Sequence, residues 1–277
     1  MTNFLRVIGG RGNNKIVEPR AWNVERQKTK TRYLTTRNME ISIIYEDKNI
    51  IAVNKPAGVV VHSDGRTKEY TLSDWVVEHY PSIRGVGEPI KLTHGGEIPK
   101  HGIAHRLDRD TSGVMIIAKN QESFLFFKKQ FQEREIEKTY RAIVYGRVKE
   151  TKGIIDKPIG KSRSDFRQWS AEKGARGTLR EATTEYELLK STKDFSYLSL
   201  YPKTGRTHQI RVHLKSIGHP VLCDKLYAKN RPCFGELPRM ALHAFSISIN
   251  TPEGASITIE APVPKDFEEA LAELGLL

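Results

Sequence analysis

The segment His105-Arg-Leu-Asp-Arg-Asp-Thr-Ser-Gly113 leads directly into the apolar run Val114-Met-Ile-Ile-Ala118. A short apolar run bounded by turn residues is typical of a buried β-strand, and Thr-Ser-Gly supplies the turn. Asp108 lies between Arg106 and Arg109, close to this predicted strand. Because a carboxylate held near a sheet is costly when it is unpaired, we expect either a cationic partner for Asp108 or a role in capping its own turn.

Short β-branched or alternating runs on both sides of this segment predict the rest of a sheet. The predicted strands are residues 41–45, 50–54, 59–62, 140–145, 183–189, 195–200, 242–249 and 256–260. Helices are predicted after Thr71, which begins a capping-box pattern, and after Asn120. Loops are expected over residues 82–100 and 149–181. Since the strands come in runs with few helices between them, the sequence predicts an α+β fold with a mixed, largely antiparallel central sheet and flanking helices.

The charge balance favours a polyanionic partner. The 277 residues include 45 Lys plus Arg and 33 Asp plus Glu, a formal net charge of +12. A field of this sign attracts nucleic acid and speeds its encounter. Residues 1–40 hold nine basic and three acidic side chains, half of that net charge, and we interpret them as a basic N-terminal arm. The arm either binds phosphates or is a solvated tail that aids solubility.

We expect neither a membrane span nor a signal peptide. No stretch approaches the roughly 18 apolar residues that cross a bilayer, and Arg6 interrupts the opening apolar residues. The expected location is therefore cytoplasmic, where Cys223 and Cys233 are most simply reduced thiols. A zinc site that combines them with His219 and His243 is the alternative, but Cys233 and His243 lack the close spacing of zinc modules, so we expect no metal.

A second polar stretch, Gly205–Ile217, has the pattern of a short amphipathic helix that Thr207 can cap. The basic positions on one of its faces are His208, Arg211 and Lys215. Together with Arg206 in the first turn, they make a positive corner suited to a phosphate or a carboxylate. Arg211 is therefore a candidate partner for Asp108, and a solvated basic face is the alternative.

These two stretches, His105–Gly113 and Thr204–Leu214, closely resemble the signature motifs of the RluA-type pseudouridine synthases. Three more stretches resemble other landmarks of that family and occur in the same order. They are Asn54-Lys-Pro-Ala-Gly58 with His62, Lys138-Thr-Tyr140 with Gly146, and Pro158-Ile-Gly160. The resemblance spans about residues 41–262 and implies that residues 41–277 form the catalytic domain, with the pseudouridine synthase fold. Many members carry a small RNA-binding domain ahead of it, but residues 1–40 are too few, so no separate folded RNA-binding domain is expected there.

The resemblance also implies an activity and a set of site residues. The family isomerises uridine in ribosomal or transfer RNA, breaking the bond from N1 to C1′ and rejoining the base through C5, with no cofactor. Asp108 matches the family's essential aspartate, Tyr140 its active-site tyrosine, and Arg211 the arginine that pairs with the aspartate. Arg106 matches a position that helps fill the space left by the extruded base. The remaining predicted substrate-binding residues are His105, Arg206, His208 and Lys55.

These residue types suit the chemistry. Uracil N1 is a poor leaving group, so a carboxylate that acts at the sugar or on the base divides the isomerisation into easier steps. Arg211 would keep Asp108 charged and oriented through charge-assisted hydrogen bonds. Tyr140 would accept the proton that leaves C5, or stack on the base. Since a paired or stacked uridine cannot present both faces, we expect it to be extruded from the RNA before it reacts.

Two other functions stay open on the sequence alone. An RNA-binding ribosome-assembly factor or chaperone on the same fold would bind RNA without depending on catalysis. A metal-dependent phosphodiesterase that uses His105 and Asp108 would need further ligands nearby. Asp110 is the rival carboxylate, and we expect it to support the turn or an arginine. Nothing in the sequence demands more than a monomer.

Overall fold

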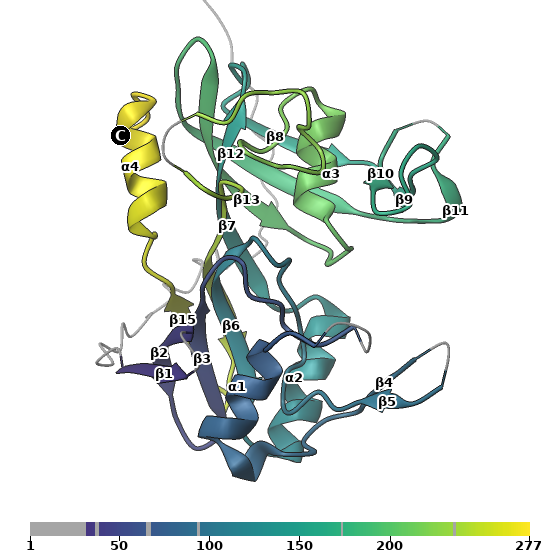
Figure 1. Cartoon of the computed structure of the whole chain (residues 1–277), viewed down its shortest axis with the longest axis vertical. Coiled ribbons are helices and arrows are strands. Elements are labelled where there is room, and N and C mark those ends of the chain that lie inside the picture. The colour runs from purple at the N-terminus through teal and green to yellow at the C-terminus, as the bar shows by residue number, and fades with distance from the viewer. Residues whose placement is uncertain (1–31, 37–38, 65–67, 93–94, 173, 235–236) are drawn as a thin grey trace, which may run out of the picture.

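A ten-stranded mixed sheet runs through the part of the chain that the computed structural model describes, residues 32–36, 39–64, 68–92, 95–172, 174–234 and 237–277 (Figure 1). Across the sheet, the strands are β1 (Arg32–Thr36), β2 (Met39–Glu46), β3 (Ile50–Lys55), β6 (Ser112–Ala118), β14 (Leu242–Asn250), β7 (Glu137–Tyr145), β13 (Phe195–Pro202), β12 (Thr183–Ser191) and β8 (Lys152–Asp156), and β15 (Ser256–Glu260) pairs with β14. Only β6 and β14 pair in parallel among these strands. The predicted α+β fold with a mixed, largely antiparallel sheet is therefore confirmed.

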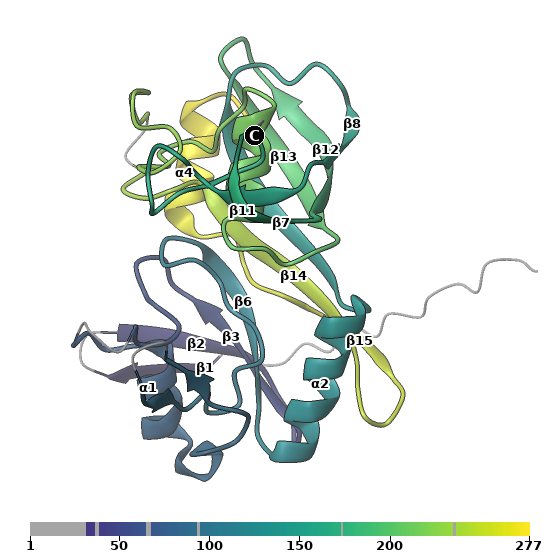
Figure 2. The same ribbon diagram turned by 90° about the vertical axis from the view of Figure 1, so that its right-hand side faces the viewer.

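Four α-helices flank the sheet in the described residues: α1 (Leu72–His79), α2 (Gln121–Glu133), α3 (Gln209–Ser216) and α4 (Lys265–Glu273). Both predicted starts are confirmed, since Thr71 and Asp74 form the capping box of α1, and the Asn120 side chain accepts from the Ser123 N–H at α2. In both views, α1 and α2 lie with β2, β3 and β6 in one half of the molecule, and α3 and α4 lie with β12 and β13 in the other (Figures 1 and 2). The sheet thus joins two halves.

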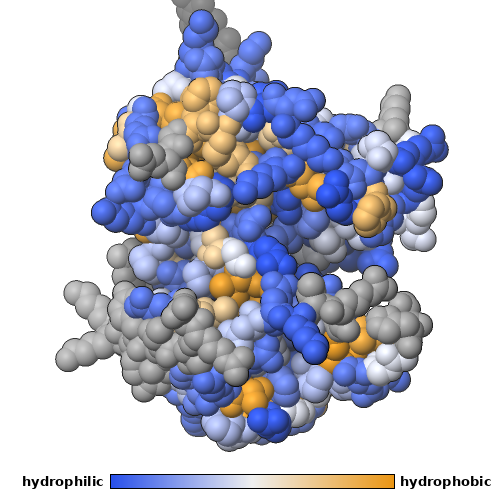
Figure 3. All heavy atoms as spheres, in the orientation of Figure 1, coloured by the Kyte–Doolittle hydropathy of each residue, from blue (hydrophilic) through white to orange (hydrophobic). Residues whose placement is uncertain are grey.

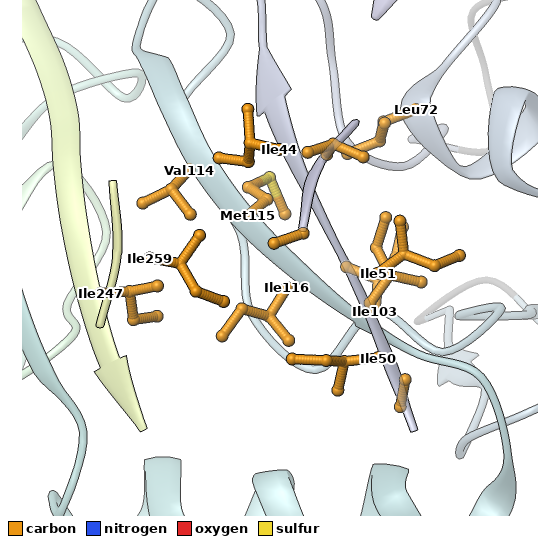
Figure 4. Close-up of a cluster of buried hydrophobic side chains, with 14 of the residues drawn as sticks. Ile44, Ile50, Ile51, Leu72, Ile103, Val114, Met115, Ile116, Ile247 and Ile259 are labelled. Carbon is orange, nitrogen blue, oxygen red and sulfur yellow. The ribbon is translucent and has the colours of Figure 1, made fainter. Parts of the chain in front are cut away.

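Each half has its own hydrophobic core. The first core surrounds β6, whose seven residues are all buried, and includes Met115, Ile51 and Ile103 (Figure 4). Burial on both faces explains why β6 reads as an unbroken apolar run. The second core packs β7 and β13 against α3 and α4. Tyr140, on β7, packs against both cores, so it lies at the junction of the two halves.

The predicted strand at residues 59–62 is wrong. The backbone carbonyls of Val60 and Val61 accept from the first N–H groups of α1, those of Leu72 and Ser73. These carbonyls therefore complete the start of a helix instead of pairing with a neighbouring strand. The segment still has an apolar role, since Val61 is buried in the first core.

Two predicted loops contain regular structure. Residues 82–100 include the end of a 3-10 turn (Pro81–Ile83) and a small hairpin of β4 (Ile90–Lys91) with β5 (Glu97–Ile98). The segment 149–181 holds β8 and a three-stranded sheet of β9 (Ile159–Lys161), β10 (Trp169–Ser170) and β11 (Arg176–Arg180). All five residues of β11 are exposed. Such short strands bury too little to show the alternation on which sequence-based prediction depends.

The expected cap of α3 is also wrong. His208, with φ of 56°, occupies the N-cap position and makes no side-chain capping bond. The side chain of Gln209 bonds to the segment before the helix instead, since its Oε1 accepts from the Arg206 N–H at 3.0 Å and from the Thr204 hydroxyl at 2.6 Å. The segment before α3 is therefore tied down by an amide rather than by Thr207.

The two cysteines are not free thiols, as Cys223 and Cys233 form a disulfide with their Cα atoms 4.9 Å apart. A turn that follows Cys223 folds residues 224–232 back on themselves, and sequence spacing alone does not reveal this. The alternative zinc site loses both thiols for the same reason. Among the residues that the structure describes, no group of three or more His, Cys, Asp or Glu side chains is arranged to hold a metal ion.

The sheet begins earlier than residue 41. Residues 32–36 pair with β2 in an antiparallel register, so the last part of the segment expected as an arm is an edge strand. Residues 1–31, where the rest of the predicted arm falls, lie outside the described residues. No helix in the described part of the chain is long and apolar enough to cross a membrane.

Candidate active site

A pocket of about 600 Å³ opens where the loop before β6, the strand β7 and the start of α3 meet. Seven of the eight predicted site residues border it: His105, Arg106, Asp108, Tyr140, Arg206, His208 and Arg211. Its volume lies within the range of small-molecule sites, so it has room for a nucleoside. The two motifs, about a hundred residues apart in the sequence, thus meet at one pocket.

Asp108 and Arg211 are in direct contact. Arg211 Nη1 donates to Asp108 Oδ2 at 2.9 Å, and the Asp108 side chain is 22% exposed. His208 Nε2 lies 3.9 Å from the other carboxylate oxygen, Oδ1, which is too long for a hydrogen bond. One oxygen of Asp108 is therefore held by a guanidinium, while the carboxylate as a whole remains accessible from the pocket.

Arg211 is itself held by a second carboxylate that the sequence analysis missed. Its Nε and Nη2 donate to the two oxygens of Asp224 at 2.7 and 2.9 Å. Asp224 is buried and also accepts from the backbone N–H groups of Leu226 and Tyr227. The available signal was a lone acidic residue directly after the apolar run Val221-Leu222-Cys223. This bidentate pair fixes the plane of the guanidinium.

Tyr227 is a second residue that sequence reasoning missed. Its ring lies beneath the Arg211 guanidinium, 4.9 Å from ring centre to Cζ. Its hydroxyl lies 2.8 Å from His208 Nδ1 and accepts from the backbone N–H of Trp169, in β10, at 2.9 Å. Burial lowers the pKa of His208, although the Asp108 charge opposes the shift, so the imidazole is neutral near pH 7.

Lys55 is not part of the pocket. Its ammonium is fully buried and donates to the carbonyls of Pro56, Val59 and Arg109 at 2.8 to 3.0 Å. Burial lowers the pKa of Lys55 to about 7, and the charges of Asp110 and Asp108 oppose that shift. All three donors of the ammonium are used, so the structure does not support the predicted contact with substrate. Lys55 instead anchors the loop that carries Asp108, with Asp110 supplying nearby negative charge.

The start of β6 also fixes this loop. Gly113 has φ of +118°, and a Cβ built there would lie 2.1 Å from the carbonyl oxygen of Ala244, in β14. Only glycine allows this close approach of two strands. His105 Nε2 accepts from the Ile116 N–H at 2.9 Å, and its ring stacks on Phe131. His105 therefore borders the pocket but also attaches the loop to the sheet.

Tyr140 presents a neutral phenol to the pocket. Burial, and then the nearby charge of Asp108, raise the pKa of Tyr140 well above its ordinary value. The hydroxyl thus keeps its proton at neutral pH. Lys138, on the same strand, also borders the pocket, and burial lowers the pKa of its ammonium.

The pocket is strongly cationic. Asp108 is the one acidic residue among the described residues that line it. The basic residues of the lining are Arg106, Arg134, Lys138, Lys203, Arg206 and Arg211. Arg106 is exposed, whereas Arg206 Nε donates to the Glu181 carbonyl at 3.0 Å. The arrangement combines one usable carboxylate with an anion-attracting wall.

Comparisons with known proteins point to one family. A model of the RNA pseudouridylate synthase family matches residues 49–216. An uncharacterised RNA pseudouridine synthase of Synechocystis sp. is 37% identical over 245 residues, which make up 87% of this chain and 71% of that protein. Ribosomal large subunit pseudouridine synthase D of Borreliella burgdorferi is 36% identical over 84% of this chain and 68% of its own length.

A solved structure gives the same result. Human RNA pseudouridylate synthase domain containing 4 aligns with a TM-score of 0.65 and 25% identity, over 84% of this chain and 92% of that one. The family match covers more than half of the chain and includes both motifs that meet at Asp108. The chain therefore belongs to the RNA pseudouridylate synthase family, with the motifs of its RluA-type members, and is an RNA pseudouridine synthase, an isomerase.

Proposed function

We propose that this enzyme converts uridines of ribosomal large-subunit RNA to pseudouridine, with Asp108 as its catalytic carboxylate. The contact between Asp108 and Arg211 inside a cationic pocket carries the proposal. The choice of RNA follows the names of several relatives, among them the protein of Borreliella burgdorferi. Transfer RNA is the alternative substrate.

The reaction needs a carboxylate that is charged and has a free oxygen. The bond from N1 to C1′ breaks, the uracil turns, a bond from C5 to C1′ forms, and the proton on C5 leaves. Attack of the carboxylate on C6, attack on C1′ and removal of the 2′ proton all need the ionised form. Arg211 binds Oδ2 of Asp108, so Oδ1 is the oxygen left to meet the nucleoside. Asp224 keeps Arg211 in that position.

Tyr140 is suited to the last step. A neutral phenol accepts a proton only as it releases its own, so we propose that Tyr140 relays the C5 proton to water while its ring packs against the base. In this relay, water is the final acceptor of the proton lost from C5.

The surroundings of the pocket suit an RNA strand. Hydrophilic residues cover most of the face seen in Figure 3, and apolar residues appear there as separate patches. The exposed Arg106 borders the pocket beside Asp108, where it would enter the space that an extruded base leaves behind. Extrusion requires a few kcal/mol of unstacking, and basic groups on the phosphates would offset part of it.

The test compares two carboxylates that are two residues apart. The full chain, Asp108→Asn and Asp110→Asn would each be incubated with transcripts of large-subunit ribosomal RNA and of transfer RNA, and pseudouridines would be mapped. We expect Asp108→Asn to lose at least about 10³-fold in rate with RNA affinity within a few-fold, while Asp110→Asn stays within about tenfold of the parent. Activity retained by Asp108→Asn would refute the catalytic assignment, and modification of transfer RNA alone would refute the proposed substrate.

A further inference from the structure

The hydroxyl of Tyr227 occupies a defined place between a backbone donor and an imidazole. It accepts from the Trp169 N–H at 2.9 Å and lies 2.8 Å from Nδ1 of His208. Tyr227 is only 5% exposed, so water does not readily complete its hydrogen bonding. The position of the phenolic proton can therefore be worked out from these two neighbours.

Only one arrangement gives the phenolic O–H of Tyr227 an acceptor. The phenol oxygen accepts from Trp169, and its own proton has one acceptor among the described residues, Nδ1 of His208. If Nδ1 carried a proton instead and donated to Tyr227, the phenolic O–H would be buried without an acceptor. Buried donors without acceptors are unfavourable and rare. The phenol therefore donates, and Nδ1 is the unprotonated nitrogen.

The charge state of both groups agrees with this arrangement. Burial lowers the pKa of His208 and raises that of Tyr227 far above its ordinary value, so the imidazole and the phenol are both neutral at pH 7. A neutral imidazole with a bare Nδ1 carries its single proton on Nε2. That N–H lies 3.9 Å from Oδ1 of Asp108, beside the oxygen that Arg211 leaves free.

We propose that Tyr227 is a positioning residue that holds His208 in its Nε2–H tautomer, and that this N–H donates to an oxygen of the target nucleoside seated against Asp108. The separation from Oδ1 is too long for a direct hydrogen bond, so the donor is not used up by the carboxylate. Uracil carbonyls and ribose hydroxyls are acceptors of the required kind. A neutral donor at this place also leaves the negative charge of Asp108 intact. The inference rests on the proposed role of Asp108.

A pair of substitutions at His208 tests which nitrogen matters. The amide nitrogen of Gln reaches the place of Nε2, whereas that of Asn reaches only the place of Nδ1. We expect His208→Gln to keep the rate within about tenfold and His208→Asn to lose about 10²-fold, with KM for RNA changed less than threefold in both. Equal rates for the two variants would overturn the assignment.

Tyr227→Phe tests the positioning role in two backgrounds. With His208 present, loss of the hydroxyl frees the tautomer, and we expect the rate to fall about tenfold. In the His208→Gln background there is no imidazole tautomer for Tyr227 to hold, so we expect Tyr227→Phe to cause no further loss of rate. A purely structural role of Tyr227 would not produce this non-additivity. The same loss in both backgrounds would contradict the proposal.

A direct measurement separates this inference from the proposed function. Nitrogen-15 NMR of the full chain, with the His208 signals identified by their absence in His208→Gln, reports which ring nitrogen bears the proton. We expect Nε2 to be protonated in the parent and the preference to weaken in Tyr227→Phe. A protonated Nδ1 in the parent would overturn the inference whatever the activity assays show. An active Asp108→Asn would refute the proposed function without touching the tautomer.

Discussion

Asp108 and Asp224 share the guanidinium of Arg211, yet they occupy opposite environments. Asp224 has a fully buried side chain and receives two bonds from Arg211 and two from backbone N–H groups. Asp108 is 22% exposed and receives one bond from Arg211. Asp224, with all these hydrogen bonds, is buried on the side of Arg211 away from the pocket. Asp108, with a single hydrogen bond from Arg211, lines the pocket.

This difference assigns separate tasks to the two acids. A carboxylate whose oxygens are fully occupied cannot react, but it compensates a buried cation and fixes its direction. A carboxylate with a free oxygen is available to a substrate. Asp224 therefore makes Arg211 a rigid support, and Arg211 in turn orients Asp108. Substitutions at Arg211, Tyr140 and Asp224 therefore have separable effects on rate and stability.

Arg211→Lys should have the largest effect of these changes. A point ammonium cannot bond to Asp224 through two nitrogens and to Asp108 through a third, so one carboxylate loses its partner. We expect the single-turnover rate to fall about 10³-fold and the free energy of unfolding to drop by about 3 kcal/mol. Urea unfolding and single-turnover assays measure the two effects. Near-native turnover would mean that Asp108 does not depend on Arg211.

Tyr140→Phe should have an intermediate effect. The ring and its packing against both cores remain, and only the hydroxyl is lost from the pocket that Tyr140 shares with Asp108. If the phenol relays the C5 proton, we expect a fall in rate of about 10²-fold, with RNA affinity and thermal stability close to those of the parent. Release of tritium from 5-tritiated uridine follows this step directly. An unchanged rate would restrict Tyr140 to stacking.

Asp224→Asn should affect stability more than catalysis. The amide keeps the shape but removes a buried charge, so Arg211 retains only Asp108 as an ionic partner. We expect unfolding to become easier by about 2–4 kcal/mol and the rate to fall only about tenfold. Comparing urea unfolding and rate for this variant with Asp108→Asn sharpens the contrast, because Asp108→Asn should show the reverse order of effects. A loss of activity as complete as that of Asp108→Asn would contradict the division of tasks.

Asp108 and its partner Arg211 could be predicted from local sequence patterns, whereas the residues that support Arg211 and His208 could not. The loop of Asp108 precedes a strand buried on both faces, so its apolar run and turn residues were visible locally. Arg211 was identified from the helical spacing of its segment. Asp224 and Tyr227 belong to no periodic pattern, because they act through contacts that only the folded chain creates.

Burial of polar groups was the main source of error. Lys55 is basic and lies in a motif, so the sequence predicts a contact with substrate, but three backbone carbonyls enclose its ammonium. Which carbonyls converge on a lysine is decided by tertiary structure. The sequence also does not reveal the disulfide between Cys223 and Cys233 or the short strands within residues 159–180, because spacing and apolar periodicity do not report such features.

The last prediction concerns how the two acids are held at low pH. His105 attaches the Asp108 loop to β6 through a neutral nitrogen that accepts from the Ile116 N–H, whereas an ion pair holds the turn of Asp224. Burial lowers the pKa of His105 to about 3, from an ordinary value of 6.5. Between these two pKa values the unfolded chain binds a proton that the folded chain does not. The contribution of His105 to the free energy of unfolding is therefore complete above pH 6.5, and below that pH it falls by about 1.4 kcal/mol per pH unit.

His62 and His243, whose pKa burial lowers to about 4, should add to this slope over the upper part of the same range. Urea unfolding of the parent and of His105→Gln between pH 7.5 and pH 4 isolates the contribution of His105. The difference between the two proteins at pH 7.5 measures the packing lost with the ring, and its decrease toward pH 4 measures the titration. A difference that stays constant with pH would show that His105 does not stay neutral in the folded protein, and that the loop of Asp108 is not secured by an uncharged contact.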